Sequence, residues 1–224
     1  MQVAIVNKAI GAHGGKAAVA RLNIMSWGGE MKSTLPGVGE VTGTWMQAWR
    51  LPDRLKDVQE LQIKGMKSSK IQVFNGNQAW VSWNGQTRVL RGKELAIMQQ
   101  EMYAEIFDKI APLMDKGYVL STVDEIKVEG RPAAGIKIAF KNRRDIILYF
   151  DKESGLLVKR ENQTTDGTGK LVRAELYYSD YHEIDGLKLY SKSMAYLDGK
   201  KFAEFTITEF TTFDQLNDNV FAKP

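Results

Sequence analysis

The chain has 224 residues, of which 43% are hydrophobic and 26% are charged, and it contains 20 glycines, 5 prolines and no cysteine. This composition is typical of a globular protein with a sizeable core, and it excludes collagen, low-complexity disorder, disulfide scaffolds, thiol nucleophiles and cysteine-ligated metal sites. The net charge is +4 and the basic residues are spread along the chain, so no nucleic-acid partner is expected.

The first predicted element is a helix over residues 2–22. Its apolar residues recur at intervals of three and four, which is typical of an amphipathic helix. Gly14-Gly15 lies inside the pattern, so a break or kink is expected there. Three basic residues, Lys8, Lys16 and Arg21, give the segment a cationic face, which we interpret as the solvated side of a helix that packs on its own domain.

From residue 24 the period changes to two, which predicts strands over residues 24–90. Within residues 41–51, Trp45, Gln47 and Trp49 point to one face of the predicted strand. Two Asn-Gly pairs, at residues 75–76 and 84–85, flank the next short alternating segment. Asn-Gly favours the positive φ angles of tight hairpin turns, so these strands are expected to be antiparallel neighbours.

Residues 93–111 return to helical spacing with an unusually wide apolar face. Its stripe contains Leu95, Met98, Met102, Ile106 and Ile110, with Tyr103, Phe107 and Met114 beside it. Pro112 is expected to end or kink this helix. The width of the face predicts that the helix covers an apolar surface elsewhere in the fold.

Strands are predicted again over residues 118–211. The segments are 126–128, 134–140, 145–150, 156–162, 171–181, 187–196 and 202–210. Asp-Gly and similar turn sequences separate them, which indicates an antiparallel meander without βαβ crossovers. The whole chain thus contains about eleven or twelve strands and two helical regions. No linker-like stretch divides them, so residues 1–224 are predicted to form one domain.

The predicted sheet has one wet face and one apolar face, because several strands alternate cleanly. Such a large apolar surface needs cover: the sheet curls on itself, stacks in two layers, or accepts helices against its concave side. Met98, Met102 and Met114 indicate an interior that can repack around ligands of varied shape, since methionine is flexible. The alternative is that these side chains fill the hollow permanently.

Several segments together resemble the LolA/LolB family of periplasmic lipoprotein carriers and its outer-membrane lipoprotein-sorting relatives. The matching segments are residues 9–15, 43–54, 75–80, 148–158, 178–186 and 217–224. The resemblance implies a mainly β fold: a strongly curved, half-open antiparallel barrel whose helices, including the lid helix 93–111, cover the concave face. It further implies an apolar cavity for a lipid or lipoprotein acyl chain, used in outer-membrane lipoprotein sorting.

On this basis the chain is expected to be a monomeric, non-enzymatic periplasmic carrier without cofactor or metal. Its expected partners are a lipid or acylated lipoprotein, an inner-membrane release complex and an outer-membrane acceptor. The predicted cavity-lining residues are Trp45, Trp49, Trp80, Met98, Met102, Ile106 and Phe107. Arg50 is the nearest match to a family arginine that latches the lid, but Leu51 separates it from Pro52, an offset that turns the side chain to the other face.

Three other functions are weighed against the carrier. A non-catalytic module that binds a protein or membrane surface would keep the fold without a usable cavity. An enzyme is weakly indicated by Asp180, Glu183 and Asp185 around His182, which read more simply as a strand end and an Asp-Gly turn. An outer-membrane pore is disfavoured because residues 54–64 carry charge on both faces. No signal peptide or membrane-spanning stretch is recognised in the sequence.

Overall fold

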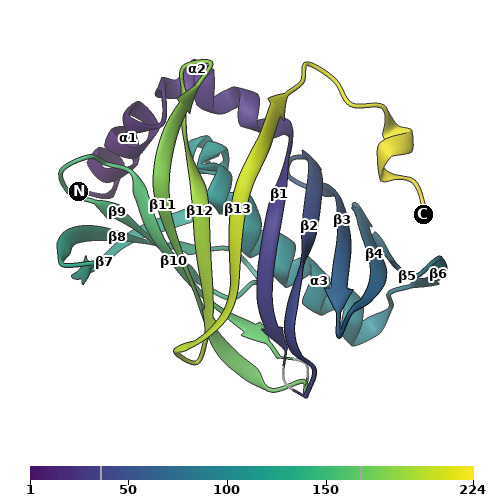
Figure 1. Ribbon diagram of the computed structural model, residues 1–224. Helices are drawn as coiled ribbons and strands as arrows, with labels where there is room; N and C mark the ends of the chain where they lie inside the picture. Colours follow the sequence, from purple (N-terminus) through teal and green to yellow (C-terminus); the bar gives the residue numbers. More distant parts are fainter. Residues whose placement is uncertain (36, 167) are drawn as a thin grey trace.

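The computed structural model describes residues 1–35, 37–166 and 168–224. Its main feature is one antiparallel sheet of 13 strands, curved and not closed (Figure 1). The strands are β1 (Ile24–Leu35), β2 (Gly39–Arg50), β3 (Arg54–Ile63), β4 (Met66–Asn75), β5 (Gln78–Trp83), β6 (Gln86–Val89), β7 (Val119–Val128), β8 (Arg131–Ala139), β9 (Ile146–Asp151), β10 (Leu157–Thr165), β11 (Leu171–Ile184), β12 (Leu187–Leu197) and β13 (Lys200–Thr212). The predicted half-open antiparallel sheet is therefore confirmed, with 13 strands where about eleven or twelve were expected.

The order of the strands explains why a helix lies inside the curve. The order is β6-β5-β4-β3-β2-β1-β13-β12-β11-β10-β9-β8-β7, so β1 pairs with β13 while β6 and β7 form the two edges. The chain between β6 and β7 must pass from one edge of the sheet to the other. That segment contains α3 (Gly92–Glu105), η2 (Ile106–Lys109) and η3 (Ala111–Met114). Figure 1 shows α3 crossing behind the strands, on the concave side.

Several hairpins use the turn residues that the sequence predicts, whereas at the predicted Asn75-Gly76 pair only Gly76 has positive φ (65°) and Asn75 ends β4. Asn84 and Gly85 both have positive φ, at 49° and 82°, and Asp198 and Gly199 repeat the pattern at 46° and 74°. Two consecutive positive φ angles are the mark of the type I′ turn, whose twist matches that of paired strands. These local sequences therefore set the antiparallel register of their hairpins.

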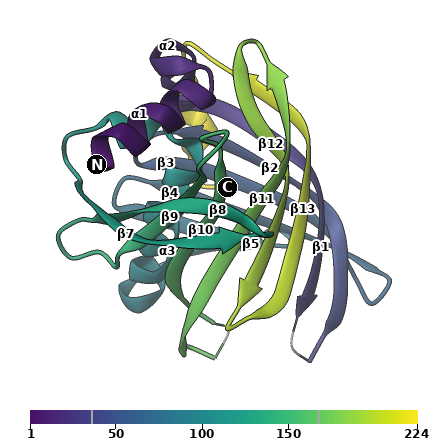
Figure 2. The same cartoon turned by 90° about the vertical axis from the view of Figure 1, so that its left-hand side faces the viewer.

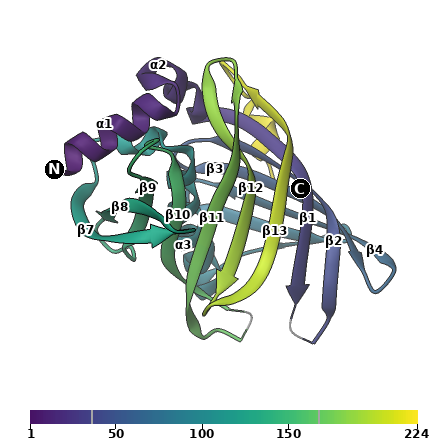
Figure 3. The same ribbon diagram turned by 60° about the vertical axis from the view of Figure 1, so that its left-hand side comes forward.

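The N-terminal segment forms two helices, α1 (Gln2–Ala12) and α2 (Gly15–Ala20), followed by η1 (Arg21–Asn23). The break falls at Gly14, where φ is 112° and a Cβ atom would lie 2.1 Å from the carbonyl oxygen of Gly186. Only glycine fits this backbone conformation and this close approach. The helices run along one rim of the curved sheet (Figures 2 and 3) and contribute Val6 and Ile10 to the core. The expected helix with a break is confirmed.

The lid segment departs from the expected single helix over 93–111. The α-helix ends at Glu105, and the chain continues as 3₁₀ turns on either side of Ile110, whose φ is 62°. Pro112 lies near the start of η3, where the missing N–H group of proline is tolerated, so the α-helix ends well before the proline is reached. No helix in the described part of the chain has both the length and the apolar character to cross a membrane.

The C-terminal segment covers part of the outer face of the sheet. The short helix η4 (Asp218–Phe221) buries Phe221 completely against Val73 and Trp80. The side-chain amide of Asn75 donates a hydrogen bond to the carbonyl oxygen of Phe221 (3.1 Å). Figure 1 shows this segment on the side of β3–β5 opposite to α3. The sheet therefore has packed side chains on both faces in this region.

Candidate functional site

A cavity of about 350 Å³ lies between α3 and the concave face of the sheet. Its wall is built by side chains from α3 and from strands of both halves of the sheet, β1–β4 and β10–β13. The apolar lining includes Trp27, Trp45, Leu55, Met98, Met102, Leu176, Tyr190, Phe205 and Ile207. The polar lining includes Gln47, Asp57, Gln59, Glu101, Glu105, Asp108, Arg160, Asn162 and Thr164. The cavity is thus amphipathic rather than purely apolar.

An interlocked aromatic cluster forms one side of the cavity. The rings of Trp27 and Trp45 meet edge to face with centroids 6.1 Å apart. Trp27 also contacts Tyr190 (5.6 Å), and Trp45 contacts Phe205 (5.8 Å), both again edge to face. Such aromatic pairs stabilise a packed surface by about 0.5–1.5 kcal/mol each beyond their buried area. This side of the cavity is therefore a fixed wall.

The opposite side is supplied by α3 and is more adaptable. Met98 and Met102 are separated by one helical turn, so they share a face, and both are buried. Methionine has three rotatable bonds and a polarisable sulfur atom, which let it fit ligands of different shape. The cavity thus combines rigid rings on the sheet with flexible thioethers on the helix.

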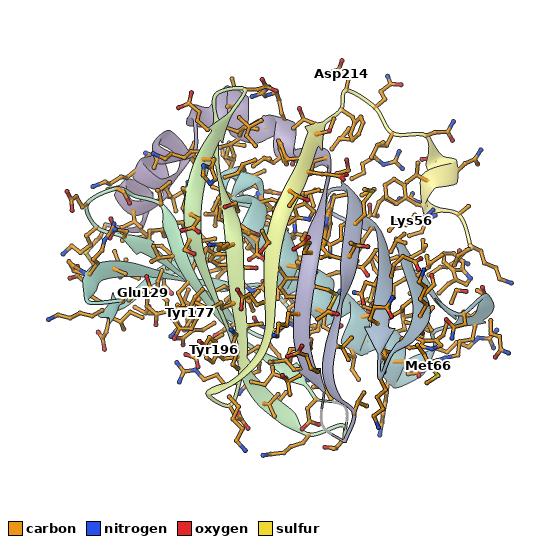
Figure 4. All side chains as sticks on the ribbon, viewed as in Figure 1. Lys56, Met66, Glu129, Tyr177, Tyr196 and Asp214 are labelled. Atoms are coloured by element: carbon orange, nitrogen blue, oxygen red, sulfur yellow. The ribbon has the colours of Figure 1, made fainter. Side chains whose placement is uncertain are left out.

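A chain of buried hydrogen bonds runs from the aromatic cluster to a carboxylate. The indole N–H groups of Trp27 and Trp49 both donate to Gln47 Oε1, at 2.8 and 2.9 Å. Gln47 Nε2 in turn donates to Asp57 Oδ2 at 3.0 Å. Figure 4 labels Lys56, which precedes Asp57 in β3 and lies beside the C-terminal segment, so the two side chains take opposite faces of the sheet.

Asp57 is the unusual residue among these hydrogen-bonded groups, because its carboxyl group is buried next to the cavity. Burial raises the pKa of its carboxyl group from 3.8 to about 6, an effect that the Gln47 hydrogen bond partly offsets. Its second oxygen, Oδ1, has no hydrogen-bond partner among the described residues. A buried carboxylate oxygen without a donor is costly, so this atom marks a place where a polar group of a ligand is favoured.

Two further buried cations support the cavity wall. The Lys109 ammonium lies 4.4 Å from the ring centroid of Trp27 and 4.0 Å from that of Trp49, and it donates to the carbonyl oxygen of Glu105 (3.2 Å). Burial lowers the pKa of this lysine, whereas the nearby Glu105 opposes the shift. The cation–π contacts and the carboxylate replace part of the hydration that Lys109 loses.

The second cation is Arg160 on β10, which forms a buried ion pair. Its guanidinium lies 2.8 Å from Asp108 Oδ2, and the Tyr178 hydroxyl donates to Asp108 Oδ1 at 2.6 Å. Burial acts to lower the pKa of Arg160, but the Asp108 carboxylate outweighs it and raises the pKa. This pair fixes the position of η2 against β10 and β11.

Of the seven predicted lining residues, the structure brings Trp45, Met98 and Met102 to the cavity wall. Trp49, Ile106 and Phe107 lie on the concave side too, but in the packed core, where each is at most 3% exposed. These three side chains fill the hollow beside the cavity. That these residues bind a ligand stays a prediction.

Trp80 lies outside the cavity. Along β5, Ala79 and Val81 face the main core, so the alternation of side chains turns Trp80 to the outer face. There it packs against Val73 and Phe221. The prediction that placed Trp80 in the lining thus took a residue from the wrong face of its strand.

Arg50 also contacts the outer face and not the lid. Its guanidinium lies 2.6 Å from Asp218, donates to the carbonyl oxygen of Leu216 (3.4 Å) and lies over the Phe221 ring (5.5 Å). In the part of the chain that the structure describes, these partners all belong to the C-terminal segment. Arg50 therefore does not contact the lid in this structure, contrary to the latch role considered for it. The one-residue offset before Pro52 gives the reason, because it turns the side chain to the other face.

Sequence reasoning missed most of the polar lining. Gln47 was placed on the inner face beside Trp45, and the same period of two in residues 54–64 puts Leu55, Asp57 and Gln59 on that face. The sequence carries a signal for these residues, because residues 54–64 have charged side chains on both faces of the strand. Arg160 and Asn162 give no comparable signal, because only the fold reveals that their side of β10 is enclosed.

The residues weighed for catalysis lie away from this cavity. Asp180 forms an ion pair with Lys192 (2.7 Å), and Asp185 begins the turn with Gly186. His182 and Glu183 are exposed. Within the described ranges, no three histidine, aspartate or glutamate residues are grouped so as to hold a metal ion.

Comparison with known proteins shows similarity in fold alone. No family model matches the chain, and no curated protein does. A LolA superfamily protein from Nitrosomonas europaea is 12% identical with a TM-score of 0.62, over 99% of this chain and 97% of that one. A putative outer membrane lipoprotein-sorting protein domain from Vibrio parahaemolyticus is 12% identical with a TM-score of 0.59, over 99% and 96%.

A third solved structure, a DUF1329 family protein from Desulfovibrio piger, is 14% identical with a TM-score of 0.59, over 99% of this chain and 97% of that one. The agreement extends over nearly the whole of each chain, so it covers the sheet, the lid segment and the terminal helices together. The chain therefore has the fold of the LolA superfamily, as its sequence motifs predicted.

Proposed function

We propose that this protein binds the hydrocarbon chain of a lipid or of an acylated lipoprotein in the cavity beneath α3. The observation that carries the proposal is the cavity itself. Its volume of about 350 Å³ lies within the roughly 300–1,000 Å³ typical of small-molecule sites. A surface-interaction module without a usable cavity accounts less well for this space.

The lining suits reversible binding of a hydrocarbon chain. Each methylene group removed from water contributes about 0.8 kcal/mol, so a chain of about a dozen carbons supplies near 10 kcal/mol before costs. Opening the lid and losing freedom on association offset part of this gain. Met98 and Met102 allow the wall to adjust to the chain that enters.

The fold also supports a proposal for the wider role. We infer that the protein is a monomeric, non-catalytic carrier that works in the periplasm in the sorting of outer-membrane lipoproteins. It would then receive its lipid or lipoprotein from an inner-membrane release complex and pass it to an outer-membrane acceptor. Support for this role comes from the fold shared with the lipoprotein-sorting domain from Vibrio parahaemolyticus.

A cavity-filling variant tests the binding site. Ala195 on β12 lines the cavity, and its neighbour Met194 faces the other side of the sheet beside Tyr177. Ala195→Phe adds a ring inside the cavity and is expected to weaken binding of a fluorescent fatty acid at least about tenfold. Met194→Phe adds a ring to the same strand on the outer face and should leave binding unchanged.

Mass spectrometry of lipid that copurifies with the wild-type protein gives an independent measurement. The proposal expects a bound lipid or saturable uptake of the fluorescent fatty acid by the folded protein. If neither is seen, or if Ala195→Phe and Met194→Phe bind equally well, the cavity is not a lipid site and the proposed function fails.

A further inference from the structure

The wall of the cavity carries an excess of negative charge. Four carboxyl groups line it: Asp57, Glu101, Glu105 and Asp108. Among the described residues that line the cavity, Arg160 alone is basic, and it is bonded to Asp108 at 2.8 Å. This ion pair neutralises one of the four carboxylates and leaves three.

Lys109 lies behind the wall and reaches only one of those three. Its ammonium is 3.7 Å from the Glu105 carboxylate. Across residues 1–35, 37–166 and 168–224, neither Asp57 nor Glu101 has a basic group within 4.0 Å. Lys70 acts on Asp57 only at longer range, and Glu105 opposes it by repulsion. Neither carboxyl group therefore has a basic group in direct contact, and Lys70 acts on both of them only from longer range.

The wall also presents hydrogen-bond acceptors that have no donor. Asp57 is 5% exposed and Asn162 is 9% exposed, and neither Oδ1 atom finds a partner in the described structure. An acceptor left in this state costs about 1–3 kcal/mol. Asn162 is independent evidence, because it lies on β10 rather than with the acidic residues of β3 and α3. Both residues line the cavity, on β3 and on β10, so its wall favours a ligand that donates hydrogen bonds over one that only accepts them.

We propose that the preferred ligand is a single-chain amphiphile whose head is a protonated primary amine. An ammonium group has three N–H donors and a positive charge, so it donates to acceptors in the wall and compensates the negative charge of its carboxylates. A hydroxyl head donates without charge, and a carboxylate head gains nothing from this wall, so a fatty acid binds through its hydrocarbon chain and more weakly than the amine. The inference deepens the proposed function and rests on it, since the hydrocarbon chain occupies the same cavity.

One group in the wall favours a hydrogen-bond acceptor on the ligand. Arg160 Nε is a donor without a partner in the described part of the chain. Its charge is already neutralised by Asp108, which also accepts a hydrogen bond from Tyr178. A hydrogen-bond acceptor on a neutral part of the ligand is enough to satisfy this one N–H group, so it does not demand a negative head.

Three ligands with the same chain separate these chemistries. Dodecylamine, dodecanol and dodecanoate are titrated calorimetrically below their micelle concentrations, at pH 7.5. This pH is above the pKa of about 6 that burial gives Asp57, so the carboxylate is ionised, and an aliphatic amine is protonated. We expect dodecylamine to bind at least about tenfold more tightly than dodecanoate, with dodecanol between them.

Variants locate the preference. Asp57→Asn keeps an oxygen for the Gln47 hydrogen bond but removes the charge, and it should weaken dodecylamine about tenfold while leaving dodecanoate unchanged or tighter. Glu60→Gln removes a carboxylate from the outer face of the same strand and should leave the affinities for all three ligands unchanged. Glu101→Gln is a second test on α3, keeps an oxygen for the Thr164 hydrogen bond, and should weaken dodecylamine about threefold.

The outcomes are distinct. Three outcomes would overturn the amine preference but leave the proposed carrier function intact. They are equal affinity for the three ligands, tighter binding of dodecanoate, and an undiminished preference for dodecylamine in both Asp57→Asn and Glu101→Gln. Binding of none of the three by the folded wild-type protein overturns the proposed function itself. A preference for amine that is lost in these two variants and kept in Glu60→Gln supports the inference.

Discussion

Strand β10 sends charged side chains to both faces of the sheet, and the two sets are bonded differently. On the outer face, Lys159 lies 2.6 Å from Glu161 and 2.7 Å from Glu175. Arg173 joins the same two carboxylates at 2.8 and 3.1 Å. Burial acts to lower the pKa of Lys159, but its bonds to the two glutamates raise it. Every charge in this outer network has partners (Figure 4 labels Tyr177 beside it).

On the inner face, the neighbouring residues Arg160 and Asn162 belong to an open arrangement. Arg160 is paired with Asp108, yet its Nε and the Asn162 Oδ1 have no partner among the described residues, and Asp57 Oδ1 across the cavity has none either. Buried polar groups in folded proteins are nearly always bonded. These three atoms belong to residues that line the cavity, so the inner face differs from the outer one in leaving polar atoms of its own wall unbonded.

The largest expected effect comes from cutting the inner ion pair. Arg160→Met leaves the Asp108 carboxylate buried without its counter-ion and should lower the free energy of unfolding by about 3–5 kcal/mol. Lys159→Met is the matched control on the outer face; Lys159 is as buried as Arg160, but Arg173 still pairs with both glutamates, so the loss should be smaller than for Arg160→Met. Urea unfolding at neutral pH measures both. Equal losses would show that the two faces do not differ in this way.

The next effect is a pH dependence that originates at Asp57. Its pKa is about 6 in the folded protein and 3.8 when unperturbed, so on raising the pH the unfolded state loses this proton first. The free energy of unfolding should therefore fall between pH 4 and pH 6, by about 3 kcal/mol in total, and stay low above pH 6. Below about pH 4 the carboxyl group of Asp57 is protonated in both the folded and the unfolded state, so it adds no pH dependence to the free energy of unfolding there.

The variant Asp57→Asn isolates this contribution. The difference in unfolding free energy between wild type and variant should decrease by about 3 kcal/mol from pH 4 to pH 7, because all other titrating groups cancel. Urea unfolding at several pH values in this range gives the difference directly. A difference that stays constant with pH would mean that Asp57 is solvated in the folded protein, contrary to its burial.

The parts of the fold that the sequence predicts are those set by local patterns. A period of two places Trp45, Gln47 and Trp49 on one face, and all three are buried on the concave side. Asn-Gly and Asp-Gly turns define hairpins because both residues accept positive φ. The Gly14-Gly15 break is local too. None of these depends on residues far away in the chain.

What the sequence does not predict depends on distant contacts. Alternation shows which side chains of one strand share a face, but it does not show whether that face is the inner or the outer one. For Trp80 on β5, only the contact with Phe221 shows that its face is the outer one. Lys109 is harder still, because lysine is rarely buried. The change to a 3₁₀ turn at Ile106 alters the rotation per residue and brings the Lys109 ammonium over Trp27.

The smallest expected effect concerns Arg50, and it separates the two faces most directly. Its ion pair with Asp218 is partly exposed, so Arg50→Ala should lower the free energy of unfolding by at most about 1 kcal/mol. Because its partners lie on the outer face, the rate of fatty-acid uptake, followed by stopped-flow fluorescence, should match that of wild type. Ala195→Phe, which changes the inner face, serves as the contrasting variant in the same assay. Faster uptake and release in Arg50→Ala would instead mean that Arg50 holds the lid closed, and that the C-terminal segment and the cavity are coupled across the sheet.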